Sequence, residues 1–273
     1  MGRNASTVAD RFSLFRRRVP GIDAVEAETR QAFSRHTHET FGVGVIVRGA
    51  QTSLSGRGVV EAGAGDMITV NPGEVHDGAP IGEAGRAWRM LYFDPAVIAG
   101  AVHDISQGKV ASREFSHPVI QDAGLARRFH RLFANLTRGV DRTATMRSEE
   151  RLLGLLAGVL TEARAAEAIP KGVGRARDLI DDDPAAPLSL DDLARASGLG
   201  RFQVLRGFAR VTGLTPHAYI IQRRIDLARR LMEGGAPLAQ AAAASGFADQ
   251  SHMTRIFVRK YGVTPGAYAR VRA

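Results

Sequence analysis

Short apolar or alternating runs, separated by glycine-rich breaks, dominate the chain from about Phe33 to Phe93. Alternation with a period of two is typical of half-buried strands, and glycine clusters between such runs are typical of tight turns. The pattern therefore predicts an antiparallel sandwich or barrel. We expect its clearest strands at residues 41–47, 59–61, 67–70 and 88–93, with turns at 48–49 and 62–66.

The spacing of apolar residues changes to a helical period after Asp122. Two amphipathic helices are predicted, at 122–139 and 145–165, and they either cover the β body or pair with a second copy of the chain. Pro170, Gly172 and Gly174 then predict a linker over 166–174. The apolar faces comprise Leu125, Phe129, Leu132, Phe133 and Leu136 in the first helix, and Leu152, Leu153, Leu155, Leu156, Val159 and Leu160 in the second.

The last hundred residues contain an internal repeat. Ala194 and the Ser-Gly-apolar triplet at 197–199 recur as Ala242 and 245–247, and Gly-apolar-Thr-Pro recurs at 213–216 and 262–265. Each copy predicts a short helix, a turn at a glycine, and a second helix that a further glycine ends. This order is that of a helix-turn-helix unit, whose second helix can enter a major groove of DNA. We expect the two units at about 188–209 and 237–258.

Length and composition add limits to this picture. The 273 residues suit two domains, which we place at 1–165 and 175–273, in an α+β protein whose second domain is all α. The chain has no cysteine, which excludes disulfides, thiolate metal sites and thiol catalysis. No apolar run approaches the roughly 18 residues of a membrane span, and Arg16 to Arg18 lack the apolar segment of a secretory signal. We therefore expect a cytoplasmic protein with no membrane partner.

The net charge of +9 is concentrated in the repeat region. Residues 171–273 carry 16 basic and 9 acidic side chains, whereas residues 1–170 carry 21 and 19. Nearly all the basic residues are arginine, whose planar fork suits phosphates and guanine edges. A basic surface that is merely solvated explains the charge equally well, so the charge supports DNA binding only together with the repeat.

The repeat resembles the DNA-binding domain of AraC/XylS-type transcription regulators, from Leu190 to Arg270. The resemblance is carried by residues 246–252, Arg255, Phe257 and 262–268 in the second copy, and by 198–208 in the first. The first copy departs from the family pattern at Gly200, where a serine cap is usual, and at Gly207. A glycine inside the second helix is expected to weaken that helix by roughly 1 kcal/mol relative to alanine.

The N-terminal half is similar to the cupin-like effector domain that this family usually carries. Two segments carry the similarity, 33–39 with its His36 and His38, and 65–76, which ends at His76. The resemblance implies a β-barrel with two packed helices that holds a small ligand, and it places a homodimer contact on the predicted helices at 122–139 and 145–165.

The residues expected to face DNA lie near the start of each second helix. Val204, Phe208, Met253 and Phe257 are spaced as core residues, which leaves the other positions exposed. Arginine can pair with guanine, glutamine with adenine, and apolar side chains with thymine methyl groups; phosphate contact or plain solvent exposure is the alternative for each. The DNA-binding candidates are Arg201, Phe202, Gln203, Leu205, Arg206, Gln250, Ser251, His252, Thr254 and Arg255.

Further basic residues of the repeat region are assigned to phosphates, ion pairs or solvent. They are Arg223, Arg224, Arg229, Arg230, Arg259 and Lys260.

His36, His38 and His76 raise the question of a metal. Two histidines at alternate positions of a strand point to one face, and a third from a nearby strand completes three metal ligands. A metal-binding cupin also uses a glutamate a few residues later, and here residues 40–43 lack one. We therefore expect no metal and no cofactor, and a histidine-lined effector site or buried, hydrogen-bonded histidines instead. The effector-binding candidates are His36, His38, His76, Arg35, Trp88, Arg89 and Tyr92, with Arg48 as a further contact.

Together these features predict a sequence-specific transcription regulator that binds promoter DNA and responds to a small effector. An arginine near the histidines favours an effector that bears a carboxylate. We expect a non-enzymatic homodimer that acts as an activator, with RNA polymerase as a partner in that case. The alternatives are a cupin metalloenzyme with a DNA-binding tail, and a DNA binder of the nucleoid type without an effector.

Overall fold

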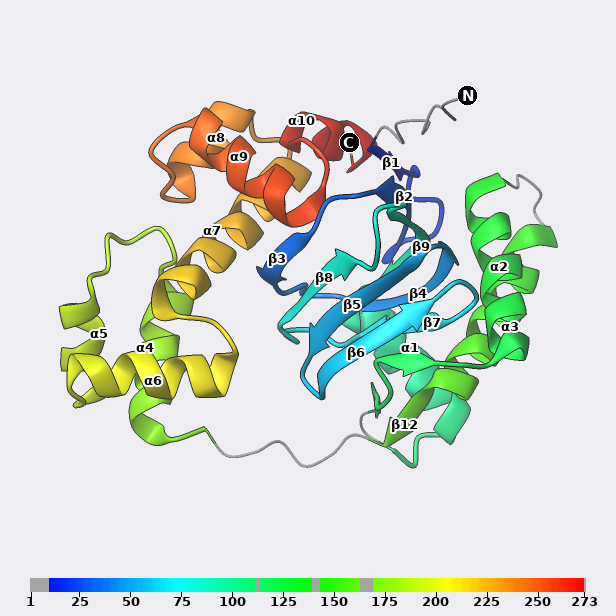
Figure 1. Cartoon of the computed structure of the whole chain (residues 1–273), viewed down its shortest axis with the longest axis horizontal. Helices are drawn as coiled ribbons and strands as arrows, with labels where there is room; N and C mark the ends of the chain where they lie inside the picture. Colours follow the sequence, from blue (N-terminus) through cyan, green and yellow to red (C-terminus); the bar gives the residue numbers. More distant parts are fainter. Residues whose placement is uncertain (1–9, 111–112, 139–142, 163–168, 273) are drawn as a thin grey trace, which may run out of the picture. The chain divides into compact units, whose positions relative to one another are not determined.

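The chain forms two compact units, residues 1–164 and 165–273. The computed structural model describes residues 10–110, 113–138, 143–162 and 169–272. The first unit holds the strands and three helices, and the second is entirely helical in its described part (Figure 1). No helix in the described ranges is long and apolar enough to cross a membrane.

Two antiparallel sheets build most of the N-terminal unit. One has six strands in the order β1-β2-β9-β4-β7-β11, the other has four in the order β3-β8-β5-β6, and β10 pairs with β12. The first sheet comprises β1 (Arg11–Leu14), β2 (Ile22–Thr29), β9 (Arg86–Phe93), β4 (Phe41–Arg48), β7 (Met67–Val70) and β11 (Val119–Ile120). The second comprises β3 (Phe33–His36), β8 (His76–Pro80), β5 (Ala50–Ser55) and β6 (Gly58–Gly63), and the short pair is β10 (Arg113–Phe115) with β12 (Leu160–Glu162).

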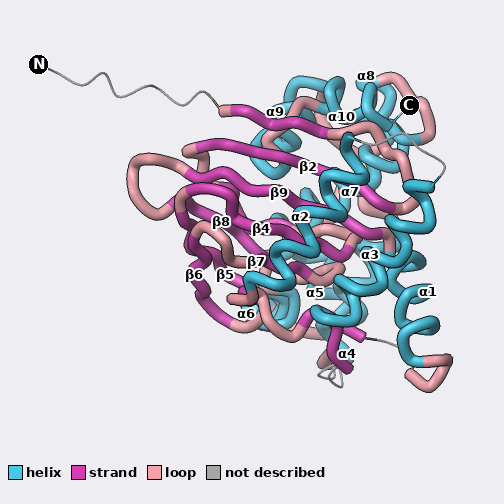
Figure 2. The backbone as a smooth tube through the Cα atoms, turned by 90° about the vertical axis from the view of Figure 1, so that its right-hand side faces the viewer, coloured by secondary structure: helices cyan, strands magenta, loops and turns pink. Residues whose placement is uncertain are grey.

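Strand β9 lies between β2 and β4 in the six-stranded sheet, and its alternating residues define two faces. Leu91 and Phe93 are fully buried in the core that contains Phe129 and Leu132. Helices α1 (Pro95–Ser106), α2 (Ala123–Arg138) and α3 (Thr143–Val159) supply the helical side of this core, and they gather along one side of the sheet (Figure 2). Because successive strand residues point to opposite faces, Arg86, Trp88, Met90 and Tyr92 share the other face, which we call the interior face.

Two glycines of β4 make room for the side chains of the interior face. Gly42 pairs with Tyr92 and Gly44 pairs with Met90. A Cβ atom on Gly44 would lie 2.1 Å from the Met90 sulfur, and one on Gly42 would lie 2.9 Å from the Met90 methyl carbon. The side chains of β9 therefore lie across β4 close to both glycines. At Gly44 a side chain is excluded, because its Cβ atom would also lie 2.5 Å from the backbone carbonyl oxygen of Arg89.

The structure corrects several expectations for this unit. Strands β1, β2, β10 and β11 lie outside the stretch from Phe33 to Phe93 for which strands are predicted, and helix α1 is likewise unpredicted. Strands β3, β5 and β8 lie within that stretch but not among its clearest strands. The predicted helix at 145–165 begins at Thr143 and ends at Val159, because Leu160–Glu162 pairs with Arg113–Phe115 as β12. Pairing with a strand some 47 residues away is a long-range interaction that the local helical period of this segment does not reveal. The last three residues of that prediction lie outside the described residues.

The C-terminal unit contains the two expected helix-turn-helix units on either side of a long central helix. The first consists of α5 (Leu190–Ser197) and α6 (Arg201–Thr212), and the second of α8 (Leu238–Ala244) and α9 (Gln250–Tyr261). Helix α7 (Pro216–Glu233) joins them, with α4 (Lys171–Asp182) before and α10 (Pro265–Arg272) after. The turns predicted at Gly198 and Gly246 are confirmed, and both glycines adopt the left-handed conformation, with φ values of 67° and 79°.

The expected linker at 166–174 is wrong in its last part, because α4 begins at Lys171. Val173 is buried in the core with Leu193 and Phe208. A Cβ atom on Gly172 would lie 3.0 Å from the carbonyl oxygen of Ser197. The glycine at this position thus permits close packing of α4 on the first helix-turn-helix unit rather than a flexible connection. Residues 166–168 lie outside the described part of the chain.

Gly207 serves the same packing. A Cβ atom there would lie 2.9 Å from Cγ2 of Val173, whose branched side chain is buried. Alanine would gain roughly 1 kcal/mol of helix propensity, but overpacking a tight core typically costs about 1–3 kcal/mol. The glycine that the sequence marks as a weak point of α6 is therefore a packing requirement.

We expect Gly207→Ala to lower the urea midpoint of the helical transition, followed by far-ultraviolet circular dichroism. Gly207→Ala in a Val173→Ala background relieves the contact, so it should cost less than the same change in the wild type. A Gly207→Ala protein that is more stable than the wild type would show that helix propensity outweighs packing here.

Candidate effector site and DNA-reading helices

Strands β3 and β8 bring three histidines together. His36 pairs directly with His76 across these strands, and His38 follows two residues after the end of β3. Their ring centroids are 4.4 Å apart for His36 and His76, 4.9 Å for His36 and His38, and 5.0 Å for His38 and His76. His36 and His38 are buried and His76 is half-buried. These distances confirm that the three side chains converge. We call His36, His38 and His76 the histidine cluster.

Backbone carbonyls fix the orientation of two of the imidazoles. Nδ1 of His36 lies 2.7 Å from the carbonyl oxygen of Ser34, and Nδ1 of His76 lies 3.0 Å from that of Glu74. A carbonyl only accepts hydrogen bonds, so the neutral rings carry their proton on Nδ1. Nε2 is then the nitrogen with the lone pair in both rings.

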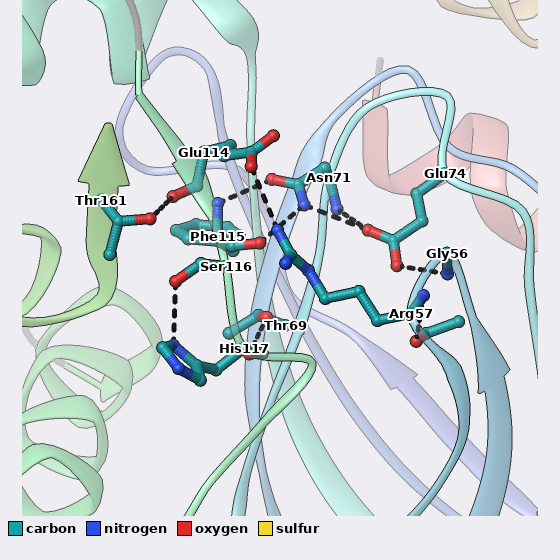
Figure 3. A network of polar contacts seen from close by, with 11 residues as sticks. Gly56, Arg57, Thr69, Asn71, Glu74, Glu114, Phe115, Ser116, His117 and Thr161 are labelled. Carbon is teal, nitrogen blue, oxygen red and sulfur yellow. Dashed lines mark hydrogen bonds and ion pairs between the residues drawn. The ribbon is translucent and has the colours of Figure 1, made fainter. Parts of the chain in front are cut away.

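The loop that precedes His76 is fixed by a polar network (Figure 3). The Asn71 amide donates to the Phe115 carbonyl at 3.0 Å and accepts from the Phe115 backbone N–H at 2.8 Å. The Glu74 carboxylate accepts from the backbone N–H groups of Asn71 and Gly56, both at 3.0 Å. Gly73, at φ +74°, donates its N–H to the His38 carbonyl at 2.8 Å. These hydrogen bonds hold the backbone segments that carry His76 and His38.

Arg86 is a buried arginine on the interior face, with only 1% of its surface exposed. Its guanidinium carbon lies 4.9 Å from the Trp88 ring and 5.6 Å from the Phe33 ring, and Phe12 packs edge-on against both rings. Nη2 donates to the Gly78 carbonyl at 3.1 Å, whereas Nε and Nη1 have no hydrogen-bond partner among the described residues. We call these four side chains, Arg86, Phe12, Phe33 and Trp88, the arginine–aromatic cluster.

The electrostatic cost of this burial is visible in the pKa of Arg86. Burial lowers the pKa of its guanidinium to about 10, which still leaves the group charged near neutral pH. A buried charge with unpaired N–H groups is unfavourable unless something else satisfies it. The described residues therefore compensate the charge of Arg86 only in part.

The two clusters border the same interior face. Arg86 reaches Gly78, which stands two residues after His76 on β8 and so shares its face of that strand. Tyr92, two alternations along β9 from Trp88, has its ring 5.0 Å from that of His38. The separation of His76 and Gly78 along the strand is about 7 Å. The two clusters are therefore neighbours on one face of the unit.

The structure brings together only some of the predicted effector contacts. His36, His38, His76, Trp88 and Tyr92 lie at the interior face as described above. Arg89 occupies the opposite face of β9, where it pairs with Glu26 at 2.9 Å and its guanidinium stacks on Phe133.

Two further arginine predictions also lie elsewhere. Arg35 has a side chain that is 55% exposed and lies 3.8 Å from Asp77. Arg48 pairs with Glu28 at 2.5 Å. Arg86 is the arginine of β9 that lies at the interior face, and the sequence contains a signal for this position. It precedes Trp88 by two residues, and the burial of Leu91 and Phe93 fixes which alternation faces the helices.

We call α6 and α9, the second helices of the two helix-turn-helix units, the reading helices. The first of them, α6, exposes the expected residues to solvent. Val204 and Phe208 are buried, as predicted from their spacing. Phe202 is 65% exposed and Leu205 38%, both uncommon for large apolar side chains, and the Arg206 guanidinium stacks 4.4 Å from the Phe202 ring. These three residues form one exposed apolar and cationic surface on α6.

Other candidates on α6 have a local structural role. The Gln203 side chain accepts a hydrogen bond from the Gly200 backbone N–H at 2.9 Å, which caps the start of the helix in the absence of a serine. Arg201 lies 3.2 Å from Asp191 of α5, with both side chains largely exposed. These two residues position the start of the helix.

The second reading helix, α9, is capped by Asp249, whose carboxylate accepts from the His252 backbone N–H at 2.6 Å. Gln250, Ser251 and Arg255 are exposed, and Thr254 is half-buried. The His252 ring packs edge-on against Phe247 at 5.4 Å. Of the five predicted residues, His252 is thus the one that mainly packs against the preceding turn.

The basic residues of α7 are used within the fold. Arg224 donates to the carbonyl oxygens of Pro184 at 2.9 Å and Gly246 at 2.7 Å, which ties the segment after α4 to the second turn. Arg229 stacks on the rings of Tyr261 and Tyr268. Arg223 pairs with Asp181 at 2.9 Å, which is an ion pair of the kind that the sequence allows for this group.

Lys260, at the end of α9, belongs to a buried polar group on α7. Its ammonium donates to the Gln222 side chain at 3.0 Å, and Gln222 donates to Asp226 at 3.0 Å. Burial lowers the pKa of Lys260 to about 8, an effect that the charge of Asp226 partly offsets. This group anchors the second reading helix to the central helix.

The lowered pKa predicts a pH dependence. The unfolded chain holds the lysine proton up to about pH 10.4, so between about pH 8 and 10 the unfolded state binds more protons and the folded state gains stability as pH rises. We expect the stability difference between the wild type and Lys260→Met to shift in favour of the wild type over this range. Far-ultraviolet circular dichroism in urea measures it, with Trp88, the only tryptophan, reporting separately on the N-terminal unit. A pH-independent difference would contradict the assignment.

Comparison with known proteins agrees with this architecture. Residues 19–156 match the AraC-like ligand binding domain, and residues 193–270 match a helix-turn-helix domain. The chain is 26% identical over 229 residues to the uncharacterized HTH-type transcriptional regulator YbfI of Bacillus subtilis, with 82% of each chain covered. It is 33% identical over 92 residues to the multiple antibiotic resistance protein MarA of Escherichia coli, which spans 33% of this chain and 72% of MarA.

A solved structure shares the whole fold. The crystal structure of ToxT from Vibrio cholerae with a bound unsaturated fatty acid has a TM-score of 0.55 at 13% identity, and it covers 99% of this chain and 98% of that chain. The two family matches, one in the N-terminal unit and one in the C-terminal unit, together identify the family of the chain. The chain belongs to the AraC-type transcription regulators, with an N-terminal ligand-binding domain and a C-terminal helix-turn-helix DNA-binding domain.

Proposed function

We propose that this regulator binds a small, carboxylate-bearing effector at the interior face of its N-terminal unit and changes its occupancy of promoter DNA in response. The observation that carries the proposal is Arg86, a buried cation with two nitrogen atoms that no described residue satisfies. An effector acts on DNA binding only if it binds one state of the protein more tightly than another.

A carboxylate suits Arg86 for two reasons. An unpaired buried N–H costs about 1–3 kcal/mol, and a carboxylate accepts two parallel hydrogen bonds from the planar guanidinium. Phe12, Phe33 and Trp88 surround the cation with aromatic surface that suits the carbon part of such a molecule. A larger effector would also reach His36, His38, His76 and Tyr92, and we propose these side chains as its polar contacts.

The ToxT comparison supports an acidic ligand for a chain of this fold, because the ligand in that structure is an unsaturated fatty acid. The present chain places its own cation, Arg86, against the aromatic rings of Phe33 and Trp88. We therefore propose the class of effector as a carboxylate attached to a compact, partly apolar body.

For the DNA-binding unit, we propose that the exposed residues near the start of α6 and α9 contact base edges. Phe202, Leu205 and Arg206 do so in the first unit, and Gln250, Ser251, Thr254 and Arg255 in the second. Their exposure and the burial of Val204 and Met253 support this placement. Two reading helices in one unit address successive major-groove segments, roughly 34 Å apart on DNA, without requiring a palindrome.

We also propose a cytoplasmic homodimer that acts as an activator through RNA polymerase. The support for this proposal is the resemblance of the chain to AraC-type regulators. The buried apolar residues of α2 and α3, such as Leu132 and Leu155, are used in the core of the unit itself. A dimer contact on these helices therefore requires their outward, more polar faces.

Arg255→Ala tests the placement of the second reading helix. We expect it to cost about 1–3 kcal/mol of binding to the genomic fragments that the wild type retains, and to relax the sequence preference. A gel-shift assay at fixed salt measures the effect. Arg259→Ala, which removes an equal charge from the last turn of the same helix, is the control and should weaken specific and non-specific DNA alike. Equal affinity of Arg255→Ala and the wild type would rule out this placement.

Arg86→Met tests the effector site. A panel of simple aliphatic and aromatic carboxylates should include members that raise the melting temperature of the wild type, because ligands that bind only the folded state stabilise it. Arg86→Met should lose this response while its unliganded form stays at least as stable, since it removes a buried, partly unpaired charge.

Arg89→Met, on the opposite face of β9, is the matched control and should keep the response. A response that survives in Arg86→Met, or is lost equally in both variants, would contradict the assignment of the anion to Arg86.

A further inference from the structure

We propose that the histidine cluster is a binding site for one divalent transition-metal ion, with His36, His38 and His76 as its three protein ligands. The ligand nitrogens of these residues all lie within 4.8 Å of one another. In the described part of the chain, no other group of three or more histidine, cysteine, aspartate or glutamate side chains converges in this way. The sequence pattern alone, which lacks the cupin glutamate, predicts no metal.

The distances are compatible with closure around an ion. Metal–imidazole bonds of about 2.0–2.1 Å at tetrahedral angles hold the ligand nitrogens about 3.3 Å apart. The three rings already lie 4.4 to 5.0 Å apart between centroids. The ligand nitrogens lie within 4.8 Å of one another, so they need to approach by at most about 1.5 Å to reach coordinating distance.

The protonation of the rings also suits a metal. Histidines that bind metal typically donate the other ring N–H to a backbone carbonyl or carboxylate, which fixes the tautomer and the ring orientation. His36 does so to Ser34, and His76 to Glu74. The Asn71–Glu74 network and the Gly73 N–H hold the segments that carry His76 and His38 (Figure 3). Because the site is pre-organised in this way, binding an ion costs little conformational free energy.

The donor set selects the class of metal. Three imidazoles without a thiolate or a carboxylate suit Zn²⁺, Ni²⁺, Co²⁺ or Fe²⁺ rather than Mg²⁺ or Ca²⁺. The nearby carboxylates are engaged elsewhere, since Glu74 accepts from Gly56 and Asn71, and Asp77 accepts from the Leu54 N–H at 2.6 Å. Three protein ligands leave at least one coordination position open, so the ion can also take a small ligand.

This site shares its three histidines with the part of the effector site that a larger effector would reach, but not the anion position, because Arg86 and its aromatic neighbours contribute no ligand to it. The metal would add a fixed positive charge to the interior face, beside Tyr92. A metal that binds the folded state alone stabilises the N-terminal unit. The failure of one proposal therefore leaves the other intact.

The test is a titration of the untagged, full-length protein, stripped with a chelator, with Co²⁺ and then Zn²⁺. We expect saturable binding of one ion per chain, visible absorption bands of nitrogen-coordinated Co²⁺, and displacement of these bands by Zn²⁺. Thermal unfolding followed by Trp88 fluorescence should shift upward with metal. Absence of saturable binding at millimolar metal, in the range of the weakest specific affinities, would overturn the proposal.

Three single variants and one control assign the ligands. His36→Ala, His38→Ala and His76→Ala should each weaken Co²⁺ binding by more than the 10- to 100-fold that loss of outer-shell partners typically causes. His103→Ala, which removes an exposed histidine of α1, should leave it unchanged. If one variant fails to fold, the remaining two decide. Binding that persists in the folded cluster variants, or that His103→Ala abolishes, would place the ion elsewhere and refute the site.

Discussion

The separation of the two faces of β9 is the constraint on which the N-terminal unit depends. Leu91 and Phe93 point into the helical core, and the alternation of the strand then sends Arg86, Trp88 and Tyr92 to the interior face. A shift of register by one residue would exchange the two sets, placing the arginine in the core and the leucine at the site. The burial of a few apolar side chains thus determines where a charged group is available for a ligand.

In the DNA-binding unit, the central helix α7 has the corresponding role. Arg224 binds the carbonyls of the segment after α4 and of the turn at Gly246, and the buried group around Gln222 and Asp226 holds the end of α9. Arg224 and Lys260 therefore stabilise the fold of this unit. Arg206 and Arg255, on the helices α6 and α9, are among the cations that remain exposed.

The sequence predicts the helical unit well because its signals are local. Gly198 and Gly246 show the turns, and the spacing of Val204 and Phe208 shows the buried face. The interior face was harder to predict, because the choice between Arg86 and Arg89 depends on the register of β9 against β2 and β4, which are long-range contacts. The interpretation of Gly207 as a weak point was likewise incomplete, since its reason is the approach of Val173.

The proposed coupling between the buried Arg86 of the N-terminal unit and DNA binding by the C-terminal unit is tested most directly by one measurement. Retained genomic DNA is titrated with the wild type and with Arg86→Met, each with and without a carboxylate that stabilises the wild type. The account predicts equal DNA affinity of the two proteins without the carboxylate, and a change of affinity on adding it for the wild type alone. A carboxylate response of equal size in Arg86→Met would contradict it.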